Sequence, residues 1–125
     1  MKKIIVTVLS LFLFVSGYAK GNDTIVRDGN KLVYTKTYEN GMIEKKGFYT
    51  LSRKKMGEWT SYHDNGNLNT IGNFKKGKRN GTFQHYNREG HLICVITYEN
   101  DELITYYGIN PKGGLIYKNP EGSYK

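Results

Sequence analysis

The sequence predicts an all-β protein: an elongated, single-layer antiparallel sheet of stacked β-hairpin repeats of about 24 residues each. Three observations support this fold class. Aromatic residues make up 14% of the chain and include eleven Tyr, a residue that favours strands. The fifteen Gly recur at regular spacing, whereas Pro occurs only twice. A pattern of glycines and aromatics returns every 23 to 25 residues along most of the 125-residue chain.

Residues 1–19 are typical of a secretory signal peptide. Lys2 and Lys3 precede an apolar run at residues 4–15, and small residues then suit cleavage after Ala19. The apolar run is shorter than the roughly 20 residues that span a membrane as a helix, which argues against an anchor. We therefore expect a bacterial protein that is exported to the periplasm or secreted, with no transmembrane segment after cleavage.

The rest of the chain divides into a lead-in segment at residues 20–33, a repeat domain at residues 34–117 and a C-terminal tail at residues 118–125. The repeat is clearest where residues 57–62 recur as residues 81–86, at an offset of 24. Each unit reads as two strands joined by a polar turn that ends in Gly, which adopts positive φ without steric cost. Successive hairpins are then expected to pair into one sheet.

Two glycines, Gly47 and Gly72, fall inside predicted strands rather than in turns. A glycine weakens a strand unless something else needs the space above it. We therefore expect an aromatic ring from a neighbouring strand to lie flat over each of these two positions.

The unit at residues 72–92 reads Gly-x-Phe-x-x-Gly-Lys-x-x-Gly-x-Phe-x-x-Tyr-x-x-x-Gly-x-Leu and resembles the bacterial variant of the MORN repeat. The resemblance implies stacked hairpins over residues 34–117. Some members of that family are described as antitoxin-like or immunity-like, so it also implies a toxin-neutralising role. In the last unit Asp101 stands where Gly77 stands one unit earlier, a departure typical of a capping repeat.

No residue pattern points to catalysis, and no catalytic residue, metal or cofactor is expected. His63, His85 and His91 fall at different positions of the repeat, and no His or Cys spacing matches a metal site. Cys94 is the only cysteine, which excludes an intramolecular disulfide, and it lies in an apolar strand as expected of a buried, inert thiol. We therefore predict that the protein is not an enzyme.

Basic residues cluster in two equivalent turns. The formal net charge is +8, or +6 without Lys2 and Lys3. Basic runs at residues 53–55 and 75–79 occupy the same turn in adjacent repeats and should project along one edge of the sheet. We call these seven residues the basic rim: Arg53, Lys54, Lys55, Lys75, Lys76, Lys78 and Arg79. Such a rim attracts phosphates, acidic glycans or an acidic protein; alternatively, its lysines only keep the sheet edge soluble and unpaired.

Four aromatic residues complete the candidate binding surface: Trp59, Tyr62, Phe83 and Tyr86. We predict a non-catalytic, exported module that binds a protein partner, with toxin neutralisation as the version that the resemblance implies. The alternative is an envelope surface protein that binds anionic glycan or lipid headgroups through the basic rim. Nucleic acid is not an expected partner, because export separates the chain from it and the aromatics recur at positions that the fold itself needs.

Overall fold

The computed structural model describes residues 22–110, 112 and 114–118. The predicted signal peptide and most of the predicted tail lie outside these residues. Within them all regular structure is β and no helix occurs, as the sequence predicts. In the same part of the chain, no helix is long and apolar enough to cross a membrane.

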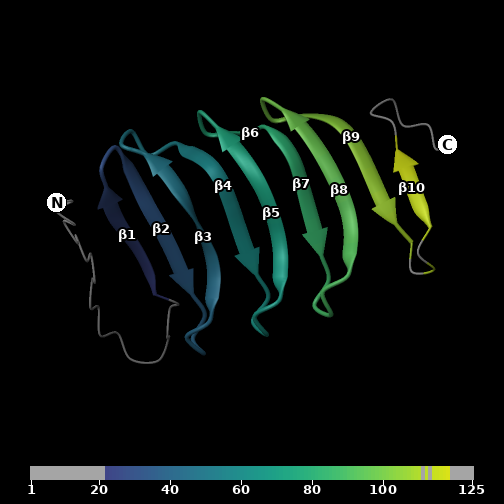
Figure 1. The fold of residues 1–125 in the computed structure, drawn as a ribbon, viewed down its shortest axis with the longest axis horizontal. Coiled ribbons are helices and arrows are strands. Elements are labelled where there is room, and N and C mark those ends of the chain that lie inside the picture. Colours follow the sequence, from purple (N-terminus) through teal and green to yellow (C-terminus); the bar gives the residue numbers. More distant parts are fainter. Residues whose placement is uncertain (1–21, 111, 113, 119–125) are drawn as a thin grey trace, which may run out of the picture.

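Ten strands succeed one another along the chain (Figure 1). They are β1 (Asp23–Asp28), β2 (Lys31–Thr37), β3 (Ile43–Thr50), β4 (Lys55–Tyr62), β5 (Leu68–Lys75), β6 (Lys78–Arg79), β7 (Gly81–Tyr86), β8 (Leu92–Glu99), β9 (Glu102–Ile109) and β10 (Leu115–Lys118).

The strands form one antiparallel sheet in the order β1-β2-β3-β4-β5-β7-β8-β9-β10, and the two-residue β6 pairs with β5. Apart from β6, strands that follow each other along the chain are therefore also neighbours in the sheet. They succeed one another along the longest axis of the molecule (Figure 1). The predicted fold class, a single-layer antiparallel sheet of stacked hairpins, is therefore confirmed.

The sheet begins earlier than the predicted repeat domain. The first hairpin, β1–β2, pairs in continuous register from Asp23↔Lys36 to Asp28↔Lys31. The predicted boundary between residues 33 and 34 thus falls inside β2, because β2 pairs with β3 as it does with β1. At the other end, β10 continues to Lys118, one residue beyond the predicted domain.

One edge of the sheet, the lower edge in Figure 1, carries four five-residue loops at residues 38–42, 63–67, 87–91 and 110–114. In each loop the first residue donates its N–H to the carbonyl of the last, over 2.8 to 2.9 Å. Three of the loops have a Gly at position four with φ between +82° and +92°. The loops start 25, 24 and 23 residues apart, which is the drift in repeat length seen in the sequence.

The opposite, upper edge carries shorter turns at residues 29–30, 51–54, 76–77 and 100–101. In the turn at 76–77, Lys76 and Gly77 have φ of 52° and 83°, as the two-residue hairpin turn of type I′ requires. Asn100 and Asp101 adopt positive φ in the same way, at 49° and 71°.

The packed centre of the sheet is a row of aromatic rings on one face, contributed by Tyr34, Tyr49, Trp59, Phe74, Phe83 and Tyr98. The centroids of contacting rings lie 4.9 to 6.1 Å apart, and most pairs meet edge to face, the geometry that aromatic quadrupoles favour. A single-layer sheet has no second layer to cover it, so these rings bury one another.

The in-strand glycines make this row possible. A Cβ on Gly47 would overlap the indole of Trp59, and a Cβ on Gly72 would overlap the ring of Phe83. The prediction that a neighbouring ring covers each glycine is therefore confirmed. Trp59 and Phe83 are 5% and 6% exposed and are the buried hydrophobic residues of the described chain.

Candidate binding surface

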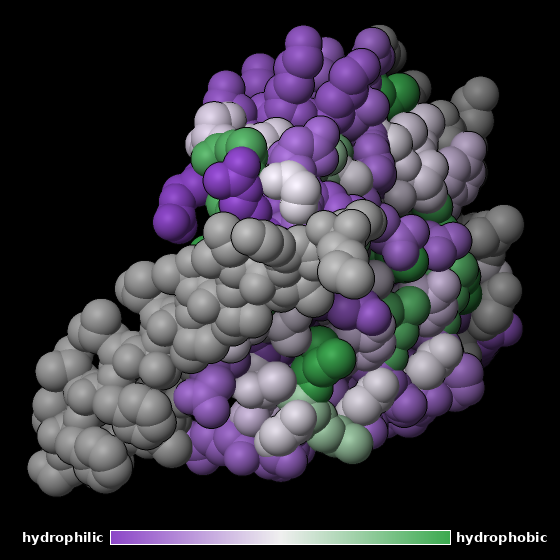
Figure 2. All heavy atoms as spheres, turned by 60° about the vertical axis from the view of Figure 1, so that its left-hand side comes forward, coloured by the Kyte–Doolittle hydropathy of each residue, from purple (hydrophilic) through white to green (hydrophobic). Residues whose placement is uncertain are grey.

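The two basic turns of the upper edge lie against each other, as the sequence predicts. The N–H of Gly77 donates to the carbonyl of Lys55 over 2.9 Å, which ties the turn at 76–77 to the start of β4. The aliphatic stem of Lys54 packs beside Gly77, since a Cβ built there would lie 3.6 Å from Lys54 Cβ. Hydrophilic side chains cover the upper end of the molecule in Figure 2.

Two of the seven rim residues are held against aromatic rings. Lys55 Nζ lies 4.6 Å from the ring centroid of Trp59 and 4.7 Å from that of Phe74. Burial there, together with the charge of Lys45, lowers the pKa of Lys55. Arg79 stacks over Tyr98, with Cζ 4.1 Å from the ring centroid. Both side chains thus cover the aromatic row by cation–π contact.

The other five rim residues are exposed: Arg53, Lys54, Lys75, Lys76 and Lys78. Among the described residues the ion pairs are Lys36–Glu44, Arg79–Asp101 and Arg88–Asp64. None of these involves the five exposed cations. The rim therefore presents a group of solvated positive charges on two adjoining turns, of the kind that attracts an anionic partner.

Arg79 is paired within the chain, a contact that the sequence analysis missed. Its backbone N–H and its Nε both donate to Oδ1 of Asp101, over 2.8 and 2.9 Å. The side-chain hydrogen bond from Arg79 is the main cause that lowers the pKa of Asp101, and the same bond raises the pKa of Arg79. The sequence shows that Asp101 departs from the repeat pattern, but it does not show that Arg79 binds the Asp101 carboxylate.

The four candidate aromatics do not form one surface with the rim. Trp59 and Phe83 belong to the core, so the prediction that they contact a partner directly is corrected: each ring fills the space above a glycine and is covered by its neighbours. Tyr62 and Tyr86 are half-buried and end β4 and β7 at the lower edge, opposite the rim. The Tyr86 hydroxyl donates to Gln84 Oε1 over 3.2 Å.

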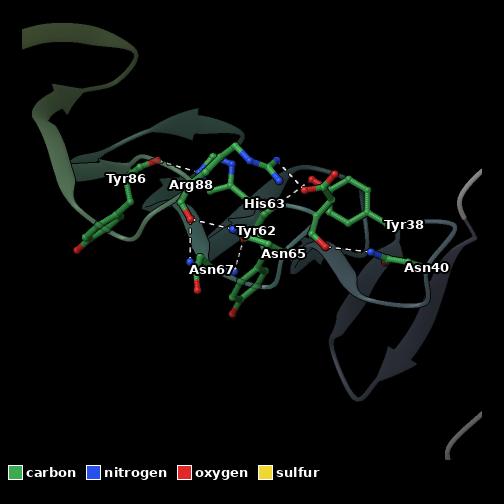
Figure 3. A network of polar contacts seen from close by, with 9 residues as sticks. Tyr38, Asn40, Tyr62, His63, Asn65, Asn67, Tyr86 and Arg88 are labelled. Atoms are coloured by element: carbon green, nitrogen blue, oxygen red, sulfur yellow. Dashed lines mark hydrogen bonds and ion pairs between the residues drawn. The ribbon is translucent and has the colours of Figure 1, made fainter.

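The lower edge carries a ladder of side-chain hydrogen bonds from the loop at 38–42 to the loop at 63–67, and from there to the loop at 87–91 (Figure 3). The Tyr38 hydroxyl donates to the carbonyl of Tyr62 over 2.6 Å, and His63 Nε2 bonds the carbonyl of Tyr86 over 2.9 Å. These contacts fix the spacing of successive hairpins.

Asparagines at the third position of two of these loops make a second set of hydrogen bonds to the next loop. Asn40 Nδ2 donates to the carbonyl of Asp64, and Asn65 Nδ2 to that of Arg88, each over 2.9 Å. The ion pair between Asp64 and Arg88, at 2.6 Å, also joins the loop at 63–67 to the loop at 87–91. The 25-residue offset between Asn40 and Asn65 was the sequence signal that could have revealed this ladder.

His85 and Cys94 are partly buried within the strands of the sheet. His85 Nδ1 bonds the Thr70 hydroxyl at 3.0 Å, and burial lowers the pKa of its imidazole. Cys94 is half-buried, and burial raises the pKa of its thiol, which disfavours the reactive thiolate form. Within the residues that the structure describes, no group of three or more His, Cys, Asp or Glu side chains could hold a metal ion.

Comparison with known proteins gives one match. Residues 57–76 and 79–100 each match the MORN repeat variant, and these segments include most of β4 and all of β5, β7 and β8. The chain is therefore similar to MORN repeat proteins over its central hairpins. Of the rim residues, the matched segments include Lys75, Lys76 and Arg79. MORN repeats are generally non-catalytic binding repeats, and the match supports a repeat-based binding module. No curated protein and no solved structure matches the chain.

Proposed function

We propose that this protein is a non-catalytic, exported module that binds an acidic partner protein through the basic rim. The observation that carries the proposal is the group of five exposed cations on two adjoining turns, at Arg53, Lys54, Lys75, Lys76 and Lys78. The match to a binding repeat at residues 57–76 and 79–100, which include Lys75 and Lys76, supports a binding role. Toxin neutralisation is the narrower version of the proposal, and the identity of the captured partner tests it.

The rigidity of the sheet favours a protein as the partner over a flexible polyanion. Equivalent turns of successive hairpins are two strands apart, which places them about 10 Å from each other. The aromatic row and the lower ladder both fix this spacing. Charges held at fixed spacing favour a partner whose carboxylates are also held in place. Two rigid surfaces lose little conformational entropy when they bind each other.

The test is a pull-down with the exported chain as bait, from envelope and secreted fractions at low and moderate salt. One protein retained near stoichiometry at both salts is the expected result. Capture of polyanions alone, all washed off as salt rises, would contradict the proposal, because it would reduce the rim to an unspecific electrostatic surface. Retention on vesicles of anionic lipid without any protein partner would favour the envelope-binding alternative instead.

A matched pair of variants assigns the capture to the rim. Lys54→Glu/Lys76→Glu reverses two exposed rim charges, and Lys46→Glu/Lys112→Glu reverses two exposed charges elsewhere. Both variants change the net charge by the same amount. We expect the first to lose the partner and the second to retain it. Equal losses would show that net charge alone, and not the rim, determines binding.

A further inference from the structure

A carboxylate of the same chain, Asp101, is bound at the upper edge by Arg79, and the geometry of that contact is specific. Asp101 Oδ1 accepts hydrogen bonds from the backbone N–H of Arg79 and from its Nε. In return, the N–H of Asp101 donates to the carbonyl of Arg79 over 2.9 Å. The backbone N–H and C=O of Arg79 thus both bond to Asp101, and a charge-assisted bond between the two side chains adds to them.

The preceding repeat has the same backbone arrangement without the carboxylate. At an offset of 24 residues, Arg79 corresponds to Lys55 and Asp101 to Gly77. The N–H of Gly77 donates to the carbonyl of Lys55 over 2.9 Å, the counterpart of the bond from Asp101 to Arg79. Because Gly77 has no side chain, it places no carboxylate where Asp101 places one.

The groups around Gly77 suit a carboxylate from outside. The N–H and the C=O of one residue in an antiparallel strand point to the same side, so the N–H of Lys55 points toward Gly77, as its carbonyl does. A Cβ at Gly77 meets only the Lys54 stem, at 3.6 to 4.0 Å, so the position is open enough for a side chain. Lys54 corresponds to Lys78, whose charge also contributes to the lowered pKa of Asp101.

We propose that the turns at 51–54 and 76–77 form a site for one Asp or Glu carboxylate on the surface of the partner protein. A partner Asp or Glu occupies, at Gly77, the position that the Asp101 side chain occupies at Arg79. The N–H of Lys55 and the ammonium of Lys54 bind it. This inference rests on the proposed function and names the chemical group that the partner presents.

The experiment measures the affinity of the exported chain for a fluorescent Asp-rich peptide by anisotropy, with the matching Asn-rich peptide as a control. Two variants are compared, Gly77→Asp and Gly77→Asn. Both residues tolerate the positive φ of this position, since Asn100 and Asp101 adopt it one repeat later. Gly77→Asp supplies an internal carboxylate and should weaken peptide binding about tenfold relative to the unaltered chain, the worth of one charge-assisted hydrogen bond. Gly77→Asn supplies an uncharged acceptor of the same shape and should weaken binding less.

A second readout needs no substitution. In the unaltered chain, the amide resonances of Lys55 and Gly77 should shift when the Asp-rich peptide is added and stay in place with the Asn-rich peptide. Equal affinities of Gly77→Asp and the unaltered chain, or unmoved Lys55 and Gly77 resonances at saturating peptide, would overturn the carboxylate site. Binding of phosphate or of anionic vesicles at these resonances, without binding of the peptide, would overturn it too.

The two proposals fail in different ways. If Lys54→Glu/Lys76→Glu loses the captured partner while Gly77→Asp binds the peptide as tightly as the unaltered chain does, the rim is the binding surface but the carboxylate site is wrong. If Lys54→Glu/Lys76→Glu keeps the partner, the proposed function fails, whichever result the peptide gives.

Discussion

The indole of Trp59 lies directly over Gly47 of the adjacent strand, so closely that a Cβ on Gly47 would overlap the ring. The indole Nε1 also donates to the carbonyl of Phe48 over 3.0 Å, which holds the ring in this position. Phe83 and Gly72 repeat the relationship one hairpin later. In a sheet with no second layer, a glycine under a ring is what allows an aromatic side chain to be buried.

Gly47→Ala should destabilise the sheet by about 2 kcal/mol, because the added methyl group forces the indole out of its place. The free energy of unfolding, measured by urea denaturation, checks this. The same substitution in a Trp59→Leu background is the control, since a smaller side chain leaves room for the methyl group. Equal costs in the two backgrounds would show that the ring does not occupy this space.

Loss of one donor from the lower ladder should have a smaller effect. Asn40→Asp keeps the acceptor for the N–H of Met42 but loses the donor to the carbonyl of Asp64, which should lower stability by about 1 kcal/mol. Asn30→Asp makes the same chemical change in an exposed turn of the upper edge and should be nearly neutral. If both substitutions cost the same in thermal unfolding, the ladder contributes nothing measurable.

The sequence allowed the hairpins, the covered glycines and the adjoining basic turns to be predicted, because each depends on a repeated local pattern. It did not show which rim residues are free. Lys55 shares a strand face with Trp59 at a spacing of four, so strand alternation could have placed it over the aromatic row. The Arg79–Asp101 pair could not be predicted, since it depends on how closely one turn approaches the next in space. The Asn40 contact left a trace in the sequence only through the 25-residue offset between Asn40 and Asn65.

Stability should fall at acidic pH partly through Asp101. The hydrogen bond from Arg79 lowers the pKa of Asp101 in the folded chain, so folding favours the charged carboxylate. This contribution is present above the ordinary Asp pKa, about 3.9, and is lost as the pH falls through the lowered folded value. Asp101→Asn should therefore lose less stability than the unaltered chain between neutral pH and about pH 2.5, measured as the shift in urea midpoint. Identical shifts in both chains would remove Asp101 from the acid response.

The separation of the rim from Tyr86 gives a last prediction about which end of the sheet binds the partner. Tyr86 ends β7 at the lower edge, whereas Lys54 and Lys76 lie at the upper edge. Tyr86→Ala should therefore retain the partner in the pull-down, under conditions where circular dichroism shows the sheet to be folded. Lys54→Glu/Lys76→Glu should lose it. The reverse result, with Tyr86→Ala losing the partner and the rim variant retaining it, would place the interface on the half-buried tyrosines, because aromatic anchors then supply most of the binding energy.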